Sequence, residues 1–481
     1  MSHAVTAVVL AAGAGTRMKS RTAKVLHEIG GRSLVAHALH ALSGAGASRT
    51  VVVVGHGREQ VGPHVEQVAP HAQVVVQHEQ NGTGHAVAEA LAALPEAVTG
   101  TVLVTYGDVP LLEPQTLAEL LTDHHAHDRA VTILTAEVPD PTGYGRILRD
   151  ASGAVTAIRE HKDATDDERA VREVNSGILA LDAAFLARAL PRLEAKNAQG
   201  ELYLTDVVAG AVAEGGTVGA FMLADPVQVE GVNDRVQLAT LGAELNRRTT
   251  ERWMRQGVTI VDPATTWLDV TVELASDVTL LPGTQLHGAT RVASGATVGP
   301  DTTLRDVVVG EDATVERTHG SDAVIGAGAT VGPFAYLRPG TELGERGKIG
   351  TFVETKNSRI GAGSKVPHLS YVGDTEVGES SNIGAGTITA NYDGVTKSRT
   401  QVGHHVRTGS HNVFVAPVSI GDGAYTGAGT VVRQDVEPGA LAVPETGQRT
   451  IGGWVPRRRP GSAAADAALN AAPNLEDNAG E

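Results

Sequence analysis

A glycine-rich segment near the start of the chain, "VVLAAGAGTRMKSRTAKVL", joins an apolar strand to a loop that can hold an anion. Gly13 and Gly15 leave their backbone N–H groups open to a close approach, and two cations, Arg17 and Lys24, follow them. The dinucleotide fingerprint needs a third glycine where Met18 stands, and no Gly-Lys pair completes a Walker loop. The segment therefore predicts a non-standard loop for a nucleoside triphosphate, the alternative being a plain turn between strand and helix.

Two further residues, Asp108 and His368, are of types that suit ligand binding and acid–base catalysis. Asp108 ends the apolar run "TVLVTYGD", and ligands of open α/β sheets bind at the carboxyl ends of strands. His368 is one of 19 histidines and could act as a base near neutral pH. Taken alone, such an aspartate is more often a turn or capping residue, and such a histidine is more often a solvated surface residue.

Composition limits the class of protein. The chain has 481 residues, too many for one ordinary core, so two or more domains are expected. A net charge of −16 argues against a nucleic-acid partner, and the lack of cysteine excludes disulfides, zinc–thiolate sites and thiol nucleophiles. The sequence shows neither a membrane-spanning run nor the pattern of a signal peptide, which predicts a soluble cytoplasmic protein with no membrane partner.

The second half of the chain repeats at six residues. Aliphatic side chains recur at every sixth position and are often followed by glycine. This spacing fits neither a helix nor a simple strand but is typical of a parallel β-helix, in which each hexapeptide supplies one strand and one corner. The two clearest runs are Ile325, Val331, Leu337, Leu343 and Ile349, and then Ile360, Val366 and Val372.

The first part of the chain predicts an α/β domain. Near-continuous apolar runs such as "AVTAVVLAA" and "TVVVVG" alternate with helical patterns at 33–46, 82–93 and 115–125. Strands without polar alternation are buried on both faces, so a doubly wound α/β fold is expected.

A helix is expected between these two parts, because Leu238, Leu241 and Leu245 form one stripe that ends before Gly257. The residues after Trp454 are poor in large apolar side chains, which predicts disorder. The predicted divisions are 1–233 for the α/β domain, 234–257 for the connecting helix, 258–455 for the β-helix and 456–481 for the tail.

Short motifs along the chain resemble those of a known family. The α/β part carries "LAAGAGTRM", "QNGTGHA", "YGDVPL", "GYGRI", "EHKDA", "NSGI" and "EGVNDR", which resemble sugar-nucleotide pyrophosphorylases. The repeat part carries "RPG", "FVETKNS", "HLSYVGD", "NIGAGTITANYDG" and "GSHNVFVAPV". Together they resemble the bacterial bifunctional N-acetylglucosamine-1-phosphate uridylyltransferases/glucosamine-1-phosphate N-acetyltransferases, from about residue 5 to about residue 454. The resemblance implies a Rossmann-like first domain, a left-handed β-helix and a role in making a peptidoglycan precursor.

For the α/β domain, the resemblance implies uridylyl transfer from UTP to a sugar 1-phosphate, with release of pyrophosphate. Arg17 and Lys24 would be catalytic cations that stabilise phosphate charge, and Asp108 and Asn233 would bind Mg²⁺ with hard oxygen atoms. The implied binding residues for UTP and the UDP-sugar are Leu10, Ala11, Ala12, Gly13, Lys24, Gln77, Gly82, Thr83, Tyr106, Gly145, Glu160, Asn175 and Asn233. Within that set, uracil is read by Gln77, Gly82 and Thr83, and the N-acetylated sugar by Gly145, Glu160 and Asn175.

For the β-helix, the resemblance implies acetyl transfer from acetyl-CoA, with His368 as general base and Glu354 as its partner in positioning. The implied glucosamine-1-phosphate site is Arg338, Lys356, Tyr371, Asn382 and Lys397. The implied acetyl-CoA site is Ala385, Asn391, Tyr392, Ser410 and Ala428. The family's acetyl-CoA pocket is shared between neighbouring subunits, so a homotrimer is expected.

Two alternatives stay open on the sequence. One is a nucleotidyltransferase with a single activity on another sugar or nucleotide, in which the β-helix is a regulatory or oligomerisation module. Lys356, His368 and Tyr371 together disfavour it. The other is a non-enzymatic metabolite sensor, which the retained cations and metal ligands of the first domain disfavour.

Overall fold

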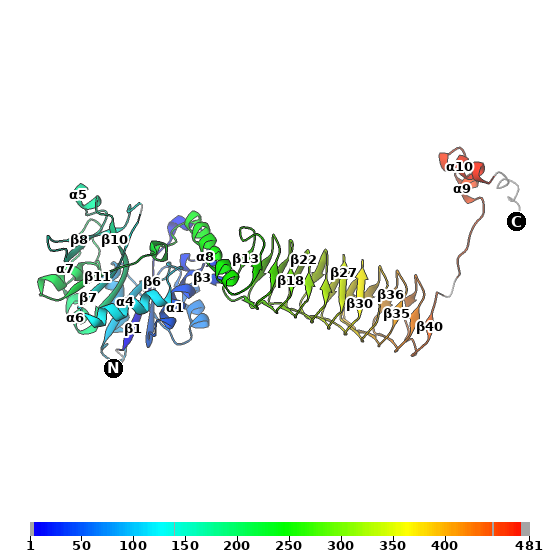
Figure 1. Ribbon diagram of the computed structural model, residues 1–481, viewed down its shortest axis with the longest axis horizontal. Coiled ribbons are helices and arrows are strands. Elements are labelled where there is room, and N and C mark those ends of the chain that lie inside the picture. The colour runs from blue at the N-terminus through cyan, green and yellow to red at the C-terminus, as the bar shows by residue number, and fades with distance from the viewer. Residues whose placement is uncertain (1–3, 139, 445–446, 473–481) are drawn as a thin grey trace. The chain divides into compact units, whose positions relative to one another are not determined.

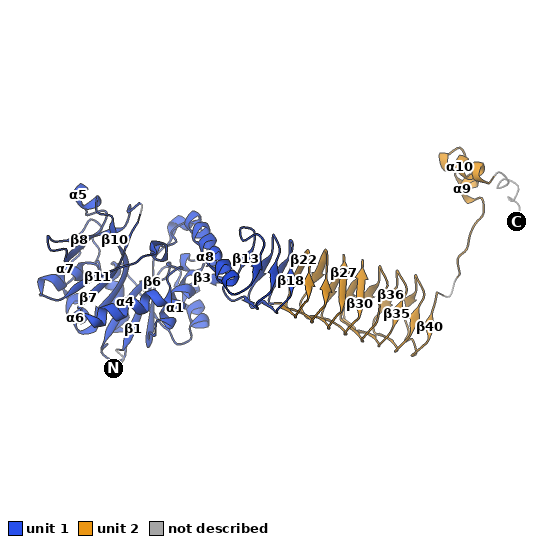
Figure 2. Cartoon of the chain, viewed as in Figure 1, with its two compact units in different colours: residues 1–306 blue, residues 307–481 orange. Residues whose placement is uncertain are grey.

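The computed structural model describes residues 4–138, 140–444 and 447–472 of the chain. Two compact units are formed, residues 1–306 and 307–481 (Figure 2). The first unit contains an α/β domain, a long helix and the first repeat strands, whereas the second contains the remaining repeats and the tail (Figure 1).

The first unit is built on a mixed nine-stranded sheet. Its strands are β1 (Val5–Ala11), β4 (Arg49–Val54), β5 (Gln73–Val76), β6 (Thr101–Tyr106), β7 (Val131–Glu137), β8 (Gly145–Arg149), β9 (Val155–Arg159), β10 (Glu173–Asp182) and β11 (Val218–Met222). They lie in the order β11-β7-β10-β6-β1-β4-β5, with β8 paired to β10 and β9 paired to β8. Only β8, β9 and β10 introduce antiparallel pairs into this sheet. The expected α/β class is confirmed, with a mixed rather than a purely parallel sheet.

Helices cover both faces of this sheet (Figure 1). The helices of the α/β domain are α1 (Leu34–Gly44), α2 (Arg58–Val68), α3 (Thr83–Ala92), α4 (Pro114–Ala126), α5 (Asp166–Arg169), α6 (Ala183–Ala189) and α7 (Asp206–Ala213). The three helices expected from the sequence are α1, α3 and α4. A short hairpin of β2 (Glu28–Ile29) and β3 (Arg32–Ser33) precedes α1.

The central strand β1 shows why its apolar run is continuous. Val5, Ala7 and Val9 pack into one core with α1, α2 and α4, whereas Val8 and Leu10 pack into a second core with α3, α6 and α7. Because successive strand residues point to opposite faces, both sets must be apolar when helices cover both faces. The carboxyl end of β1 is thereby held rigidly between two cores.

The long helix α8 (Arg235–Arg255) begins at a strong capping residue. Asp234 Oδ1 accepts hydrogen bonds from the backbone N–H groups of Val236 and Gln237, at 2.9 Å each. The leucine stripe of this helix, Leu238, Leu241 and Leu245, packs against a small core that includes Met18. The turn that ends at Met18, just after the glycine-rich loop, and helix α8 therefore share buried surface inside the first unit.

Repeat strands begin in the first unit directly after α8. They are β12 (Thr259–Ile260), β13 (Trp267–Leu268), β14 (Glu273–Leu274), β15 (Thr279–Leu280), β16 (Gln285–His287), β17 (Arg291–Val292), β18 (Thr297–Val298) and β19 (Thr303–Arg305). Strands β12 to β16 each pair in parallel with the third strand after them, as β15 does with β18, so three strands make one coil.

The second unit continues this pattern with short strands. They are β20 (Val308–Val309), β21 (Thr314–Val315), β22 (Thr318–Ser321), β23 (Ala323–Ile325), β24 (Thr330–Val331), β25 (Ala335–Leu337), β26 (Thr341–Leu343), β27 (Lys348–Thr351), β28 (Glu354–Lys356), β29 (Ser358–Ile360), β30 (Lys365–His368), β31 (Tyr371–Gly373), β32 (Thr375–Val377), β33 (Ile388–Ala390), β34 (Thr400–Val402), β35 (Arg407–Thr408), β36 (Val413–Val415), β37 (Val418–Ile420), β38 (Tyr425–Thr426), β39 (Val431–Val432) and β40 (Leu441–Ala442). Strands β24, β27 and β30 belong to one sheet, β25, β28 and β31 to a second, and β26, β29 and β32 to a third.

The six-residue repeat places its aliphatic side chains in the centre of the β-helix. All eight aliphatic residues of the two runs found in the sequence are at most 2% exposed. Each strand is too short to bury more than one or two side chains, so the core is a column of such residues stacked coil upon coil. The predicted left-handed parallel β-helix of hexapeptide repeats is confirmed as the fold of this region.

The described part of the tail differs from the expected disorder. It contains two helices, α9 (Trp454–Arg458) and α10 (Ala463–Ala471), and Ser462 Oγ caps the second by accepting from Ala465 N at 3.2 Å. Alanine has the highest helix propensity, so an alanine-rich segment with a serine cap can form a helix without large apolar side chains. Residues 473–481 of the predicted tail lie outside the described residues.

Candidate functional site

A cavity of about 380 Å³ lies at the carboxyl end of β1. It brings together eleven of the residues expected to bind nucleotide or metal, from four separate segments of the chain. They are Leu10, Ala11, Ala12, Gly13, Lys24, Gln77, Gly82, Thr83, Tyr106, Asp108 and Asn233. Four further residues line this cavity that were not expected from the sequence, namely Val25, Gln80, Ala86 and Glu201. Gln80 and Ala86 stand within the motif "QNGTGHA" and could have been found there.

Backbone hydrogen bonds fix the floor of this cavity. Gly107 N donates to Leu10 O at 3.0 Å, which joins the end of β6 to the end of β1. Val232 N donates to Asp108 O at 2.9 Å and brings in the segment that precedes α8. Asp108 and Asn233 are thus placed beside each other by two loops that are far apart in the sequence.

Lys24 lies between these two polar side chains. Its ammonium Nζ forms an ion pair with Asp108 Oδ2 and lies 3.5 Å from Asn233 Oδ1. One cation therefore contacts an oxygen atom of each predicted Mg²⁺ ligand. A carboxylate and an amide oxygen are hard donors that suit Mg²⁺, so these residues fit the ion, with phosphates and water as the other ligands.

The described residues contain no group of three or more His, Cys, Asp or Glu side chains that could hold a metal by themselves. A cation at Asp108 and Asn233 would therefore take its remaining ligands from water or from the phosphates of a bound nucleotide. Such a ligand set is typical of Mg²⁺ sites that act on phosphates.

The segment expected to read uracil is held tightly against the next loop. Gly84 N donates to Leu202 O at 2.8 Å, and Leu202 N donates to Asn81 O at 2.8 Å. Gly82 has a φ of 101°, and a Cβ there would come within 2.5 Å of Leu202 O. Only glycine fits this place, which explains the residue type. Gln77 is buried nearby and donates from Nε2 to Gly82 O at 3.1 Å.

The three residues expected to bind the sugar also come together. Gly145 and Asn175 face each other in the pairing of β8 with β10. A side chain at position 145 would come within 3.3 Å of the Glu160 carboxylate, so glycine leaves that carboxylate accessible. Burial raises the pKa of Glu160, which accepts a hydrogen bond from Thr205 Oγ1 at 3.1 Å. None of the three lines the 380 Å³ cavity itself.

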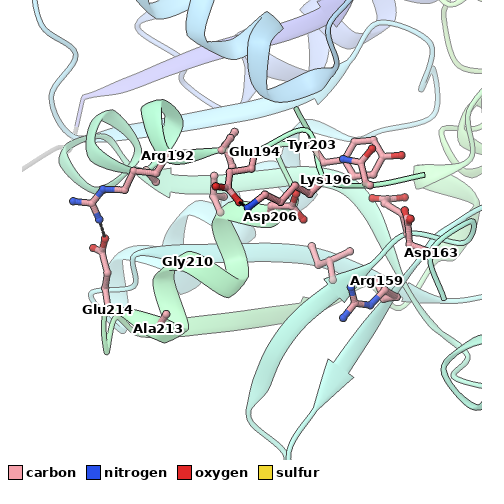
Figure 3. Close-up of a pocket in the computed structure, with 16 residues that line it drawn as sticks. Arg159, Asp163, Arg192, Glu194, Lys196, Tyr203, Asp206, Gly210, Ala213 and Glu214 are labelled. Carbon is pink, nitrogen blue, oxygen red and sulfur yellow. Dashed lines mark hydrogen bonds and ion pairs between the residues drawn. The ribbon is translucent and has the colours of Figure 1, made fainter. Parts of the chain in front are cut away.

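Glu160 instead lines a second cavity, of about 470 Å³, between β9, α6 and α7. The ion pair of Arg192 with Glu214 lies at one end of it, and Tyr203 lies toward the other (Figure 3). Burial raises the pKa of Tyr203 to about 12 and also raises the pKa of Asp206. Tyr203 and Asp206 were not expected from the sequence, although both stand in one short segment, "ELYLTD".

Arg17 is not brought to the nucleotide cavity. It lies in a single helical turn, Thr16–Met18, with its side chain exposed, and it is absent from the residues that line the cavity. Met18 is buried in the core beneath α8, so the chain direction at this turn points Arg17 away from that core. Of the described residues that line the cavity, Lys24 is the one that supplies positive charge.

Several residues expected to bind the amino sugar lie on one sheet of the β-helix. Arg338 Nη1 forms an ion pair with Glu354 Oε1 at 2.9 Å. Glu354 stands opposite Tyr371 in the pairing of β28 with β31, and Lys356 stands in the same strand. A basic, an acidic and an aromatic side chain thus share one polar surface.

The expected pairing of Glu354 with His368 is not found. Among the described residues, no hydrogen bond or ion pair joins these two side chains, and Glu354 contacts Arg338 instead. The reason is the position of the strands, because Glu354 lies in β28 and His368 ends β30, which belongs to a different sheet. Glu354 contacts Arg338 in this structure, and its role in positioning His368 stays a prediction.

Asp374 links several predicted residues and was missed. Its carboxylate accepts hydrogen bonds from Asn357 Nδ2, at 2.6 Å, and from Asn391 Nδ2. Burial alone would raise the pKa of Asp374, but these two bonds and the charges of Lys356 and Lys397 lower it below its usual value. The carboxylate ends the motif "HLSYVGD", which is the signal that could have identified it.

The residues expected to bind acetyl-CoA follow one another along the coils. His411 N donates to Ala385 O at 2.7 Å, and Gly429 N donates to Ser410 O at 2.8 Å. These bonds place Ala385, Ser410 and Ala428 on successive coils at one corner, as each coil stacks on the next.

Asn391, Tyr392 and Lys397 belong to a loop closed on itself. Tyr392 pairs with Lys397 in a short antiparallel bridge, and Ser398 N donates to Asn391 O at 2.9 Å. Asn382 lies in a parallel bridge between its neighbouring coils. The structure thus groups the amino-sugar and acetyl-CoA residues in the second unit, apart from the nucleotide cavity of the first.

The fold and the two residue groups define a class of protein: a nucleotidyltransferase domain joined to a hexapeptide-repeat β-helix. Residues 7–175 match the family model of the MobA-like NTP transferase domain. The bifunctional protein GlmU of Pseudarthrobacter chlorophenolicus is 62% identical over 469 residues, which are 97% of this chain and 95% of that protein. The bifunctional protein GlmU of Corynebacterium efficiens is 60% identical over 476 residues, 98% of both chains.

The chain belongs to the family of bifunctional GlmU proteins. The resemblance found in the motifs is confirmed, and so is the expectation of a bifunctional transferase. In the part of the chain that the structure describes, no helix has the length and apolar character needed to cross a membrane.

Proposed function

We propose that this chain makes UDP-N-acetylglucosamine in two steps, acetylation of glucosamine 1-phosphate followed by uridylyl transfer. The observation that carries the proposal is the cavity that joins the β1 loop, Lys24, Asp108 and Asn233. A triphosphate in that cavity would meet backbone N–H groups, one ammonium and two hard oxygen donors together. That combination suits phosphoryl chemistry, which depends mainly on positioning and charge.

For uridylyl transfer, a phosphate oxygen of the sugar 1-phosphate attacks the α-phosphorus of UTP and pyrophosphate leaves. Lys24 is placed to stabilise the negative charge of the phosphates, and the Gly13 loop to bind them through N–H groups. Mg²⁺ held by Asp108 and Asn233 would neutralise phosphate charge during the displacement. Glu160, Gly145 and Asn175 are proposed to bind the sugar, since they cluster beside Tyr106, which lines the cavity.

For acetyl transfer, the amine of the sugar attacks the thioester carbonyl and the CoA thiolate leaves. A ring nitrogen of His368 is proposed to take the proton that the amine loses. Its side chain is exposed at the end of β30, where a substrate can reach it. Arg338 and Lys356 are proposed to bind the phosphate of the amino sugar, and Asn391 and Tyr392 to line the acetyl-CoA side.

We propose that the active form is a homotrimer in the cytoplasm. Phe334 and Phe352 are 51% and 59% exposed and stack on each other, with ring centroids 5.4 Å apart, and Leu369 is 58% exposed. A column of exposed apolar side chains on a β-helix is suited to contact another subunit. Light scattering of a fully active monomer would contradict the trimer.

We further propose that residues 1–233 carry uridylyl transfer and 258–455 carry acetyl transfer, with 234–257 as the connecting segment. The support is the placement of each residue group inside one unit. An assay of the purified protein with glucosamine 1-phosphate, acetyl-CoA, UTP and Mg²⁺ tests the whole proposal. Omission of acetyl-CoA should stop product formation, and N-acetylglucosamine 1-phosphate should restore it.

Two variants separate the activities. Asp108→Ala should abolish uridylyl transfer and leave acetyl transfer intact, because the two groups of residues lie in different units. His368→Ala should reduce acetyl transfer by about 10²- to 10⁴-fold, the usual contribution of a general base, and leave uridylyl transfer intact. Acetyl transfer that survives His368→Ala within tenfold would refute the assigned base. A wild-type chain without acetyl transfer would favour a single-activity nucleotidyltransferase.

A further inference from the structure

The orientation of the Gln77 side-chain amide is fixed by its partners. Its nitrogen Nε2 lies 3.1 Å from the carbonyl oxygen of Gly82 and 3.1 Å from His85 Nδ1. A carbonyl oxygen only accepts, so the amide atom that faces Gly82 must be the NH₂ group. One N–H of this group goes to Gly82 O, which leaves the second N–H for His85.

This second contact determines the tautomer of His85. Because Gln77 donates, His85 Nδ1 must accept with its lone pair, and the ring proton must then sit on Nε2. His85 Nε2 lies 3.4 Å from Glu89 Oε1, one helical turn further along α3, so that proton points toward a carboxylate. Glu89, His85 and Gln77 thus form a chain in which each member orients the next.

This series of polar side chains, Glu89, His85 and Gln77, leaves one polar atom of Gln77 available. Both of its N–H groups are used, and among the described residues no donor is found for Oε1. Gln77 is only 5% exposed, yet it lines the nucleotide cavity. A ligand in this cavity therefore meets a hydrogen-bond acceptor at Gln77. The edge of uracil offers a donor, N3–H, where cytosine offers an acceptor, the N3 lone pair.

We propose that His85 is a positioning residue that makes the chain select uracil over cytosine nucleotides by holding the Gln77 amide with Oε1 toward the base. This inference rests on the proposed function, in which Gln77 reads the base. A site that presents an acceptor leaves it unpaired against cytosine, and such mismatches discriminate strongly between substrates. Without an acceptor at position 85, only the Gly82 carbonyl opposes rotation of the amide.

The test compares UTP with CTP in uridylyl transfer to N-acetylglucosamine 1-phosphate. In His85→Lys, the ammonium donates to Gly82 O and to Gln77 Oε1, so the amide turns its NH₂ group toward the base. The ratio of kcat/KM for UTP to that for CTP should fall by at least about tenfold, the equivalent of one hydrogen bond exchanged for a mismatch. The change should appear in the KM for nucleotide, with the KM for the sugar phosphate unchanged.

Three further variants complete the design. His85→Gln keeps an acceptor and should hold the ratio within about twofold of wild type, whereas His85→Leu removes the acceptor without adding charge and should lower it by about threefold. His71→Lys, at an exposed histidine just before β5, is the matched control and should leave the ratio unchanged. A kcat for uridylyl transfer from UTP within about threefold of wild type shows that the α/β domain of each variant is folded, because acetyl transfer reports only on the β-helix.

The possible results distinguish a failure of the role proposed for His85 from a failure of the proposed base-reading site. Gln77→Ala should raise the KM for UTP. If it does, and both His85→Lys and His85→Leu keep the wild-type ratio, the role of His85 is refuted while the base-reading site stands. If Gln77→Ala leaves the KM for UTP unchanged, the assignment of Gln77 to the base is refuted.

Discussion

Lys24 contacts both oxygen atoms that we propose as Mg²⁺ ligands, and this contact has a measurable cost for metal binding. A divalent ion that binds without nucleotide must displace the ammonium group. The variant Lys24→Met removes the charge and keeps a long unbranched side chain. We therefore expect Lys24→Met to bind Mn²⁺, used as a substitute for Mg²⁺, more tightly than wild type in the absence of nucleotide.

Two costs set the size of this effect. If the ammonium stayed in place, its repulsion from a divalent ion about 4 Å away would be about 2 kcal/mol even at the dielectric constant of water. The lysine can instead swing away, which costs only its ion pair with Asp108. The two side chains are 14% and 16% exposed, so the pair falls between surface and buried pairs, at about 1–2 kcal/mol. The lysine follows the less costly route, so the lost ion pair sets the penalty on metal binding. Its removal predicts that Lys24→Met binds Mn²⁺ about 5- to 30-fold more tightly than wild type.

Electron paramagnetic resonance of free Mn²⁺ during a titration measures this affinity directly. Lys19→Met, at an exposed lysine of the same loop, is the matched control and should bind Mn²⁺ like wild type. Asp108→Ala should lose the site. Uridylyl transfer by Lys24→Met should fall although its metal affinity rises, because the phosphates lose their cation. Equal or weaker Mn²⁺ binding by Lys24→Met would refute the placement of Lys24 at the metal position.

Three further changes test other parts of the structure. Asp374→Ala removes the acceptor of two charge-assisted hydrogen bonds, each worth about 1.5–3 kcal/mol. It should lower kcat/KM for acetyl transfer at least about 100-fold. Acetyl transfer within threefold of wild type would contradict this, and uridylyl transfer by the same variant is the internal control. Phe414→Ala, at a 1% exposed side chain inside the β-helix, should lower the free energy of unfolding by about 3–5 kcal/mol in urea titrations, and an unchanged midpoint would exclude the stacked core. Burial lowers the pKa of His37 to about 4, so the unfolded state binds this proton first and stability should fall by about 3 kcal/mol as pH drops from 6.5 to 4. His37→Phe should lose that part of the pH dependence, and an identical pH profile would show that His37 does not cause it.

The periodic features of the sequence determined most of the fold. The apolar run of β1 predicts burial on both faces, and its residues do divide between two cores. The six-residue repeat likewise predicts a column of buried aliphatic side chains. Both patterns are local: whether a side chain points inward depends on the few residues around it and on the strand geometry. Such patterns can be read without knowing any distant contact.

The sequence predicted the residues of the site but not all of their contacts. The motifs identified Lys24, Asp108 and Asn233, but only the tertiary structure places the ammonium between the two ligand side chains, since these residues come from loops far apart in the chain. The same applies to Asp374, whose partner Asn391 lies 17 residues away on the next coil. Which side chains meet across two loops is set by how the loops are packed, and no local pattern encodes it.

Two expectations show most clearly what the tertiary structure decided. Arg17 follows the glycines in sequence, but the helical turn after them leaves it exposed and outside the cavity lining. Glu354 and His368 are close in sequence, but the β-helix assigns their strands to different sheets, so Glu354 pairs with Arg338 instead. Sequence determined the residue types, the repeats and the cores, because these follow from local geometry. The tertiary structure decided which charges face each other, because a turn or a corner redirects a side chain by an amount that spacing along the chain does not specify.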